Sequence, residues 1–356
     1  MRYYPILFVC LTASLLIACE TNNSPSFDRQ PMLIQMADQI ILPGYEDFLA
    51  TASLLDTQVD AFAKNPTNET LAACQAAWKK AALSWKNTES FNIGPVRTRS
   101  LSSKIHYYPT PASFIETAVS NYSGSDDYIQ TLGSNRKGLA AIEFLLFSSD
   151  EHETLSQFSD EKRMAILSLY TSDLVTIATR ILNEWETYRA DFIALSGSGT
   201  SSSASLLANQ LLESLSNLNI KKLGNPMGLT DVSSSVNPDL VESPYAQESL
   251  EWIKVNLLSI AQTFNGGEGT GYDDYLDALA IDFDQNTTLS ARINQQIQVC
   301  LEAANAINQP LQTAVVNDPL AVEALLAETQ SLLSLMHTDM MSNIGLTVTP
   351  SDNDGD

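Results

Sequence analysis

Basic residues and histidine are both scarce in this 356-residue chain. It has 19 Lys and Arg against 42 Asp and Glu, which gives a formal net charge of -23. A surface of that sign repels nucleic acid, so we exclude DNA and RNA as partners. The three histidines are His106, His152 and His337, and none lies in an HExxH pattern or has glutamate three residues downstream. The sequence signatures of a zinc hydrolase are therefore missing, and we predict no catalytic residue from the sequence.

Cysteine is also rare. Two of the four cysteines, Cys10 and Cys19, fall in the N-terminal segment discussed next. Cys74 lies on the apolar stripe of an expected helix and Cys300 lies beside the stripe of another. We therefore expect two unpaired, buried thiols that behave as small apolar side chains. A disulfide between them is the alternative, because an exported protein reaches an oxidising compartment.

Long apolar runs are missing except at the start of the chain. Residues 6–18 form an uncharged apolar run after Arg2, shorter than the roughly 20 residues of a permanent transmembrane helix. The run ends in the lipobox pattern Leu-Ile-Ala-Cys, with Cys19 as its cysteine. We expect residues 1–18 to be a lipoprotein signal peptide, Cys19 to carry lipid that attaches the protein to a membrane of the bacterial cell envelope, and residues 19–30 to form a flexible tether. An ordinary secretory signal is the alternative.

Apolar residues recur at spacings of three and four along the remaining chain, and no stretch alternates as a strand would. This predicts an all-α protein made of two four-helix bundles, at residues 31–220 and 221–356, joined by a linker at 221–238. Ser243-Pro244 is expected to begin a helix, and Gly266 to end it. A long irregular loop at residues 91–125 follows the second helix, and long loops of this kind often line a site.

One carboxylate stands inside the most apolar segment of the chain. Residues 138–147, GLAAIEFLLF, place Glu143 among apolar neighbours on an expected helix. A glutamate is rarely buried without a partner, so Glu143 should face a cleft or a specific donor. Gly138, near the helix start, indicates close approach by a backbone or a ligand. The alternative for Glu143 is a structural role, in which it accepts hydrogen bonds from a neighbouring loop.

This segment resembles the GxHxxE signature of the imelysin-like family, and further segments resemble that family in the same order. Alanine stands at position 140, where the family has histidine, so the glycine and glutamate of the signature are present without the His-Glu pair. The other resembling segments are Ile41–Tyr45, Trp78–Pro95, Lys222–Pro226, Glu242–Tyr245 and the acidic ending from Gly345 to Asp356.

The resemblance implies two similar helical bundles with a functional site at their interface, and iron or haem as the ligand. We therefore expect a non-catalytic, lipid-anchored binding protein, with an envelope uptake partner and no resident cofactor. The expected ligand-binding residues are Gly138, Ala140, Glu143, Glu89, Arg97 and Tyr245, with Glu143 as a metal ligand. Two alternatives remain: a scaffold protein whose site has decayed, and a metallopeptidase, which Ala140 disfavours.

Overall fold

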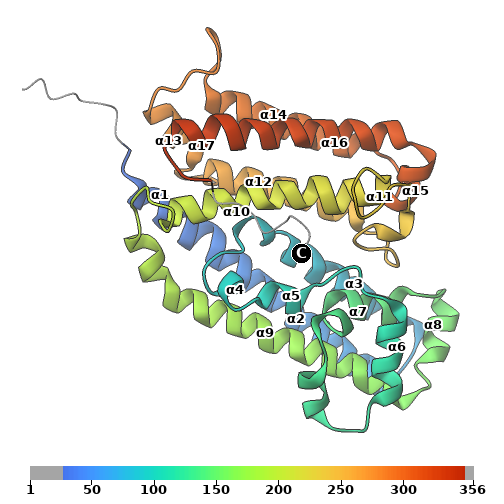
Figure 1. The fold of residues 1–356 in the computed structure, drawn as a ribbon. Coiled ribbons are helices and arrows are strands. Elements are labelled where there is room, and N and C mark those ends of the chain that lie inside the picture. The colour runs from blue at the N-terminus through green and yellow to red at the C-terminus, as the bar shows by residue number, and fades with distance from the viewer. Residues whose placement is uncertain (1–26, 349–356) are drawn as a thin grey trace, which may run out of the picture.

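All of the extended regular structure in the described part of this chain is helical. The computed structural model describes residues 27–348, which contain helices and two isolated β-bridges but no β-strand (Figure 1). The all-α prediction is confirmed. The signal peptide predicted at residues 1–18, Cys19, most of the predicted tether and the acidic residues 351–356 lie outside the described residues, so these features remain predictions. The first described helix begins at Arg29, inside the range predicted for the tether.

The first half of the chain supplies one four-helix bundle. α2 packs against α3 and α9, and α7 packs against the same two helices. The elements of this half are α1 (Arg29–Gln35), η1 (Met36–Ile41), α2 (Leu42–Lys64), α3 (Asn68–Lys86), η2 (Glu89–Phe91), α4 (Pro95–Thr98), α5 (Leu101–Ile105), α6 (Ala112–Asn121), η3 (Asp126–Thr131), η4 (Ser134–Arg136), α7 (Leu139–Phe147), α8 (Glu151–Gln157) and α9 (Glu161–Ala194).

The long helices of this first bundle have side-chain caps at their starts and buried apolar faces. Thr67 and Thr70 form a capping box at the start of α3, and Asp160 accepts a backbone hydrogen bond at the start of α9. Such caps satisfy amides that have no partner inside the helix. Trp78 of α3 and Trp185 of α9 are buried. The apolar stripes read from the sequence therefore face the bundle interior.

The connection after α3 is long, as predicted, but it is not irregular throughout. It contains the short helices α4, α5 and α6. Pro95 lies in the first turn of α4, where the missing N–H of proline costs no helical hydrogen bond. Helices of four and five residues leave little periodicity to detect, which is why the sequence pattern did not predict α4 and α5.

The second half forms a second four-helix bundle. α12 and α16 each pack against α10 and α14, and Figure 1 shows α14 and α16 side by side on the face remote from α9. The elements are α10 (Ser203–Asn217), η5 (Leu218–Gly224), α11 (Asn225–Met227), η6 (Pro238–Leu240), α12 (Ser249–Asn265), α13 (Tyr272–Ala278), α14 (Leu289–Ala306), α15 (Leu311–Asn317), α16 (Pro319–Ser334), η7 (Leu335–Met340) and α17 (Met341–Asn343).

The helix that begins at Ser203 does not end near residue 220. It continues through the π-helical turn η5 and α11 to Met227, so the non-helical part of the predicted linker begins only at Gly228. A π turn accommodates an extra residue without interrupting the helix, and Pro226 lies in the first turn of α11. The contacts of α10 place it with the second bundle, while the division at residue 220 into two domains remains a prediction.

The start of α12 differs from its prediction. The Ser243-Pro244 cap was expected to begin this helix, but α12 begins at Ser249. Ser243 donates its hydroxyl hydrogen bond to Glu143 of the first bundle instead of capping α12. The predicted end is confirmed, because Gly266 adopts the left-handed conformation that closes the helix.

Helix α9 is long and apolar enough to cross a membrane by length and composition alone, a feature that the sequence analysis did not anticipate. It packs against α2 and α7 as a core helix of the first bundle. Asp173 on this helix pairs with buried Lys137, and Arg189 pairs with Asp38. Burial against neighbouring helices therefore accounts for its apolar composition.

The two cysteines in the described residues are buried and unpaired, as expected. Cys74 lies in α3 and Cys300 lies in α14. Burial raises the pKa of both thiols to about 12, so they are protonated at neutral pH. They act as small apolar side chains in the two bundles.

Candidate functional site

Glu143 is buried and joins the two halves of the chain. Its side chain, on α7, accepts hydrogen bonds at Oε1 from the Ser243 hydroxyl (2.7 Å) and from the backbone amides of Tyr245 (3.0 Å) and Ala246 (2.8 Å). The residue is 1% exposed. These hydrogen bonds connect the turn that precedes α12 to helix α7 of the first bundle. This arrangement corresponds to the structural alternative that the sequence left open, with partners from the second half.

The charge of Glu143 is not balanced by a cation. Within residues 27–348 no lysine or arginine forms an ion pair with it. Burial raises the pKa of the carboxyl group to about 7, and the hydrogen bonds from Ala246, Ser243 and Tyr245 limit the increase. Glu143 is therefore partly protonated near neutral pH.

Three of the predicted site residues, Ala140, Glu143 and Tyr245, line one small cavity. Tyr108, Thr110, Asp239 and Glu242 add polar groups to its wall, and its volume is about 210 Å³. That volume equals about seven water molecules at roughly 30 Å³ each, whereas pockets for larger organic ligands span roughly 300–1,000 Å³. The cavity can therefore hold water or a very small molecule but not a haem or a large chelate.

Gly138 is a packing residue. Its φ of +79° lies in the region that favours glycine. A Cβ at this position would lie 2.5 Å from the backbone oxygen of Ile105. The close approach expected at Gly138 is therefore made by the backbone of the last turn of α5 and not by a ligand.

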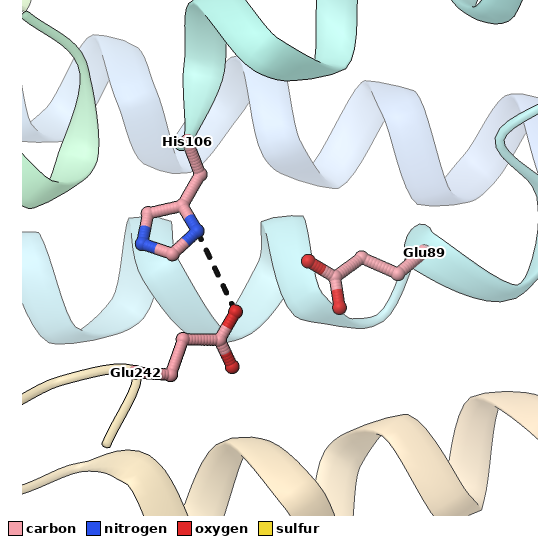
Figure 2. A group of neighbouring side chains, drawn as sticks. All are labelled: Glu89, His106 and Glu242. Carbon is pink, nitrogen blue, oxygen red and sulfur yellow. Dashed lines mark ion pairs between the residues drawn. The ribbon is translucent and has the colours of Figure 1, made fainter. Parts of the chain in front are cut away.

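Glu89 lies in a different environment, together with two residues that the sequence analysis did not place in the site. Figure 2 shows the side chains of Glu89, His106 and Glu242 pointing toward one another from η2, from the residue after α5 and from the segment before α12. Their ligand atoms lie within 4.8 Å of one another. Taken alone, these three side chains have the composition of a metal site.

Lys86 occupies the centre of this group. Its Nζ lies 2.6 Å from Glu89 Oε1, 2.6 Å from Glu242 Oε1 and 3.1 Å from His106 Nδ1. The Lys86 side chain is fully buried, and its ammonium group also lies over the ring of Trp252. A metal ion bound by the three residues would have to displace the buried Lys86 ammonium group.

Lys222, from the π-helical turn η5, completes the cluster. Its Nζ lies 2.6 Å from Glu89 Oε2, 3.1 Å from Glu242 Oε2 and 2.6 Å from Asn256 Oδ1. Two lysines thus balance two glutamates. We call Lys86, Glu89, His106, Lys222, Glu242 and Asn256 the buried ionic cluster.

The two lysines set the protonation states of their neighbours. Burial alone would raise the pKa of Glu89, but Lys222 and Lys86 hold it well below its usual range. Burial and the Lys86 ammonium group hold the pKa of His106 well below its usual range, so this imidazole is neutral. Although His106 Nδ1 lies 3.6 Å from Glu242 Oε1, that contact is not an ion pair of a charged histidine. The cluster is a charge-balanced connection between the halves.

Arg97 lies at neither of these sites. It lines a much larger pocket of about 1,060 Å³ between the two bundles, with α4 and α9 on one side and α10, α16 and η7 on the other. Arg97 pairs with Glu213 of α10, and Arg99 pairs with Glu184 of α9. His337 and Tyr188 also line the space. We call this space the interbundle pocket.

Gly138 packs against α5, and the other five predicted site residues divide among three places. Ala140, Glu143 and Tyr245 share the small cavity, Glu89 belongs to the buried ionic cluster, and Arg97 lines the interbundle pocket. Glu89 and Arg97 were expected to share one ligand site with Glu143, but Glu89 pairs with Lys86 and Lys222 and Arg97 pairs with Glu213.

Comparison with known proteins agrees with the fold and with the family that the sequence resembles. The imelysin family model matches residues 41–337, which is most of the chain. The chain belongs to the imelysin family. It is 25% identical over 307 residues to iron-regulated protein A of Synechococcus elongatus, a match that covers 82% of this chain and 80% of that protein.

Two solved structures share the fold of this imelysin-family chain. An imelysin-like protein from Psychrobacter arcticum superposes with a TM-score of 0.75 at 17% identity, and the match covers 91% of this chain and 97% of that one. A protein described as an iron-regulated protein A precursor from Parabacteroides distasonis gives 0.74 at 18% identity with the same coverage. The resemblance stated from the sequence is confirmed at the level of family and fold.

Proposed function

We propose that this imelysin-family protein is a non-catalytic, lipid-anchored binding protein of the bacterial cell envelope, and that it captures an iron-related ligand in the interbundle pocket. The observation that carries the proposal is the pocket itself. Its volume of about 1,060 Å³ and its walls from both bundles fit an organic ligand or metal chelate. The name of the relative iron-regulated protein A supports an iron-related ligand.

The other two candidate places are less suited to capture. The small cavity beside Ala140 and Glu143 is too small for a chelate, and Oε1 of Glu143 already accepts three hydrogen bonds. The buried ionic cluster has its central position filled by Lys86. We therefore move the proposed ligand site from Glu143 to the pocket that contains Arg97.

The same geometry argues against a metallopeptidase. A catalytic zinc site needs about three protein ligands and an open position for water. Within residues 27–348 only Glu89, His106 and Glu242 bring three such ligand atoms together. The open position that catalysis requires is taken by the Lys86 ammonium group.

Calorimetric titration tests the proposal, with ferrous and ferric ions, zinc, ferric chelates and haem as ligands. Ser334 is exposed on α16 and lines the interbundle pocket, so Ser334→Trp should obstruct it. Ser331→Trp is the matched control, because Ser331 is exposed on the same helix outside the pocket. We expect at least one iron-containing ligand to bind the parent and the control but not Ser334→Trp. If every ligand fails to bind the parent, the iron proposal is excluded.

Membrane attachment has its own test. Replacement of Cys19 by serine removes the thiol that would receive lipid, so the full-length chain should shift from the membrane fraction to the soluble fraction. Metabolic labelling with palmitate should mark the parent and not Cys19→Ser. Labelling of both proteins would exclude Cys19 as the anchor.

The second candidate function is that of an interaction protein. Several apolar side chains are exposed on the loop after α11 and near the start of α16, among them Val232 and Leu320, each 75% exposed. Exposed apolar side chains are typical of surfaces that contact other proteins when they form a contiguous patch. This function would be favoured if none of the ligands binds and if the parent self-associates while Val232→Ser/Leu320→Ser is monomeric.

A further inference from the structure

The small cavity beside Glu143 has walls of one charge sign. Three carboxylates line it, those of Glu143, Asp239 and Glu242, and no described lysine, arginine or histidine does. The interbundle pocket, by contrast, has arginines as well as carboxylates in its wall, and the two spaces share no lining residue. A concave space lined by one sign of charge concentrates ions of the opposite sign. The small cavity therefore favours a cation.

Glu143 is the carboxylate that such a cation can neutralise. Glu242 already pairs with Lys86 and Lys222 in the buried ionic cluster, and Asp239 is exposed to water. Glu143 is 1% exposed and forms no ion pair within residues 27–348. A buried charge without a partner is costly, so a positive group placed beside Glu143 lowers that cost.

The two oxygen atoms of the Glu143 carboxylate differ in their use. Oε1 accepts three hydrogen bonds from the turn that precedes α12, whereas Oε2 accepts none from the described residues. Tyr108, which also lines the cavity, has a buried hydroxyl group that lacks a hydrogen-bond partner among the same residues. Buried polar groups in folded proteins nearly always have partners. The wall therefore contains two unused polar groups, and Oε2 is suited to a ligand that carries N–H donors.

A bare metal ion does not fit these walls. Within the described residues, the single set of three converging carboxylate or histidine ligand atoms belongs to the buried ionic cluster, whose centre Lys86 fills. Glu143 and Asp239 are not members of that set, and Ala140 beside Glu143 offers no donor atom. Metal ions require several converging ligands. The cavity therefore favours a cation that needs one carboxylate.

The other walls suit an ammonium group with an alkyl chain. Tyr245 lines the cavity and packs edge-on against Phe144, with 5.3 Å between the ring centroids. Tyr108 stacks on His106 at 5.6 Å. Aromatic rings attract ammonium groups that lie over their faces. Apolar side chains complete the wall and can contact an alkyl chain: Pro109, Pro111, Val241 and Pro244.

The cavity is open to solvent on one side and limited in size. Pro109, Pro111 and Asp239 are exposed, whereas Ala140 and Glu143 are buried, so the exposed residues surround the entrance and Glu143 lies at the inner end. The volume of about 210 Å³ equals about seven water molecules at roughly 30 Å³ each. It leaves room for an ammonium group and a chain of a few carbon atoms.

We propose that the small cavity binds a small primary alkylammonium ion, whose ammonium group donates a hydrogen bond to Oε2 of Glu143 and whose alkyl chain contacts the tyrosine and proline walls. The interaction is a reversible ion pair, so no covalent bond forms or breaks. This second site is separate from the interbundle pocket, and it does not depend on the function proposed for that pocket.

Calorimetric titration of the purified full-length chain with propylammonium chloride tests the proposal. Potassium chloride at physiological ionic strength is present throughout, so that a simple monovalent cation competes. Propanol is the neutral ligand of similar size, and tetramethylammonium is a cation without N–H donors. We expect saturable binding of propylammonium, weaker binding of tetramethylammonium and no binding of propanol.

Glu143→Gln should lower the affinity for propylammonium about tenfold to a hundredfold, the range for a hydrogen bond to a charged group. Glu251→Gln is the matched control, because Glu251 is exposed on α12 and lines neither space. Ala140→Leu should also abolish binding, since its larger side chain fills the cavity and leaves every carboxylate in place. This variant decides the test if Glu143→Gln does not fold.

Four results would each overturn the proposal. They are equal affinity of the parent and Glu143→Gln for propylammonium, binding of propanol as tight as that of propylammonium, loss of binding in Ser334→Trp, and no binding to the parent. Loss in Ser334→Trp would place the cation in the interbundle pocket, which that variant obstructs. Failure of the iron ligands alone would exclude the function proposed for the interbundle pocket and leave the alkylammonium site standing.

Discussion

Lys86 and Glu242 form a 2.6 Å ion pair between positions 156 residues apart, and both side chains are removed from solvent. The pair connects α3 of the first bundle to the segment that leads into α12 of the second. Removal of one partner from a buried pair leaves the other charge uncompensated in a poorly solvated environment. The stability of the junction should therefore depend on all members of the buried ionic cluster at once.

Lys86→Met tests this dependence. The substitution leaves Glu89 and Glu242 with Lys222 as their one cation, and we expect the free energy of unfolding to fall by about 3–5 kcal/mol, as for other broken buried pairs. Urea denaturation followed by circular dichroism measures the loss. Arg180→Met, which removes an exposed pair on α9, is the control and should change stability by less than about 1 kcal/mol.

The double variant Lys86→Met/Glu242→Gln restores charge balance, because Lys222 and Glu89 then remain as a pair. We expect it to be more stable than Lys86→Met alone, with a coupling free energy of about 1–3 kcal/mol. Additive effects of the two substitutions would show that Lys86 and Glu242 do not interact as described.

Glu143 should make the folded state less stable as the pH rises. Its pKa is about 7 in the folded chain and near 4.5 in the unfolded chain, so the folded state binds more protons between these values. The contribution of Glu143 is fully present below pH 4.5 and is lost as the pH rises to about 7, on the order of 3 kcal/mol. Glu143→Gln should remove this component from a plot of unfolding free energy against pH. An unchanged plot would contradict the raised pKa.

His106 should act in the opposite direction. Because its pKa is held well below 6.5 in the folded chain, the unfolded chain binds a proton below pH 6.5 that the folded chain does not. Stability from this residue is therefore lost as the pH falls from about 6.5. We expect His106→Gln to flatten the acidic side of the same pH plot. Nuclear magnetic resonance titration of the His106 ring provides a direct measurement, and a titration near pH 6.5 would refute the neutral assignment.

Gly138→Ala should be destabilised because the new Cβ would meet the Ile105 backbone oxygen and the positive φ disfavours any other residue. We expect a loss of about 1–3 kcal/mol by urea denaturation. Gly197→Ala is the control, since open space surrounds a Cβ there. Equal stability of the two variants would exclude close packing as the role of Gly138.

Ala140→His should raise the metal affinity of the small cavity. Positions 140 and 143 lie three residues apart on α7 and both line the small cavity, so an imidazole at 140 would stand beside the Glu143 carboxylate. We expect zinc affinity to rise at least about tenfold by calorimetry. The double variant Ala140→His/Glu143→Gln should lose the gain. Retention of the gain would mean that the metal binds elsewhere.

The helical fold could be predicted because the spacing of apolar residues along each helix is visible in the local sequence. Apolar residues at spacings of three and four predict the faces of the long helices, and the caps at Thr67 and Asp160 agree with the helix starts. The predicted start of α12 was wrong because a side chain there forms a hydrogen bond with a residue far away in the sequence. Ser243 looks like a helix cap in sequence, but its hydroxyl group donates to Glu143, one hundred residues away.

The candidate site was harder to predict for the same reason. Buried Lys86 directly follows buried Trp85 on α3, which is a weak local signal, but nothing near Lys222 in sequence indicates that it meets the same carboxylates. The interbundle pocket is assembled from helices of both bundles, and the sequence analysis placed Arg97 alone of its lining residues in the site. Charge balance and cavity shape arise from tertiary packing, which periodicity does not describe.

The positions of Cys74 and Cys300 give each bundle its own natural reporter of opening. Because both thiols are buried and protonated, alkylating reagents should modify them only after the surrounding helices separate. Pulse alkylation and peptide mass spectrometry would then time the exposure of α3 and of α14 in one sample. Equal rates would show that the two bundles open as one cooperative unit, and unequal rates would show which bundle opens first.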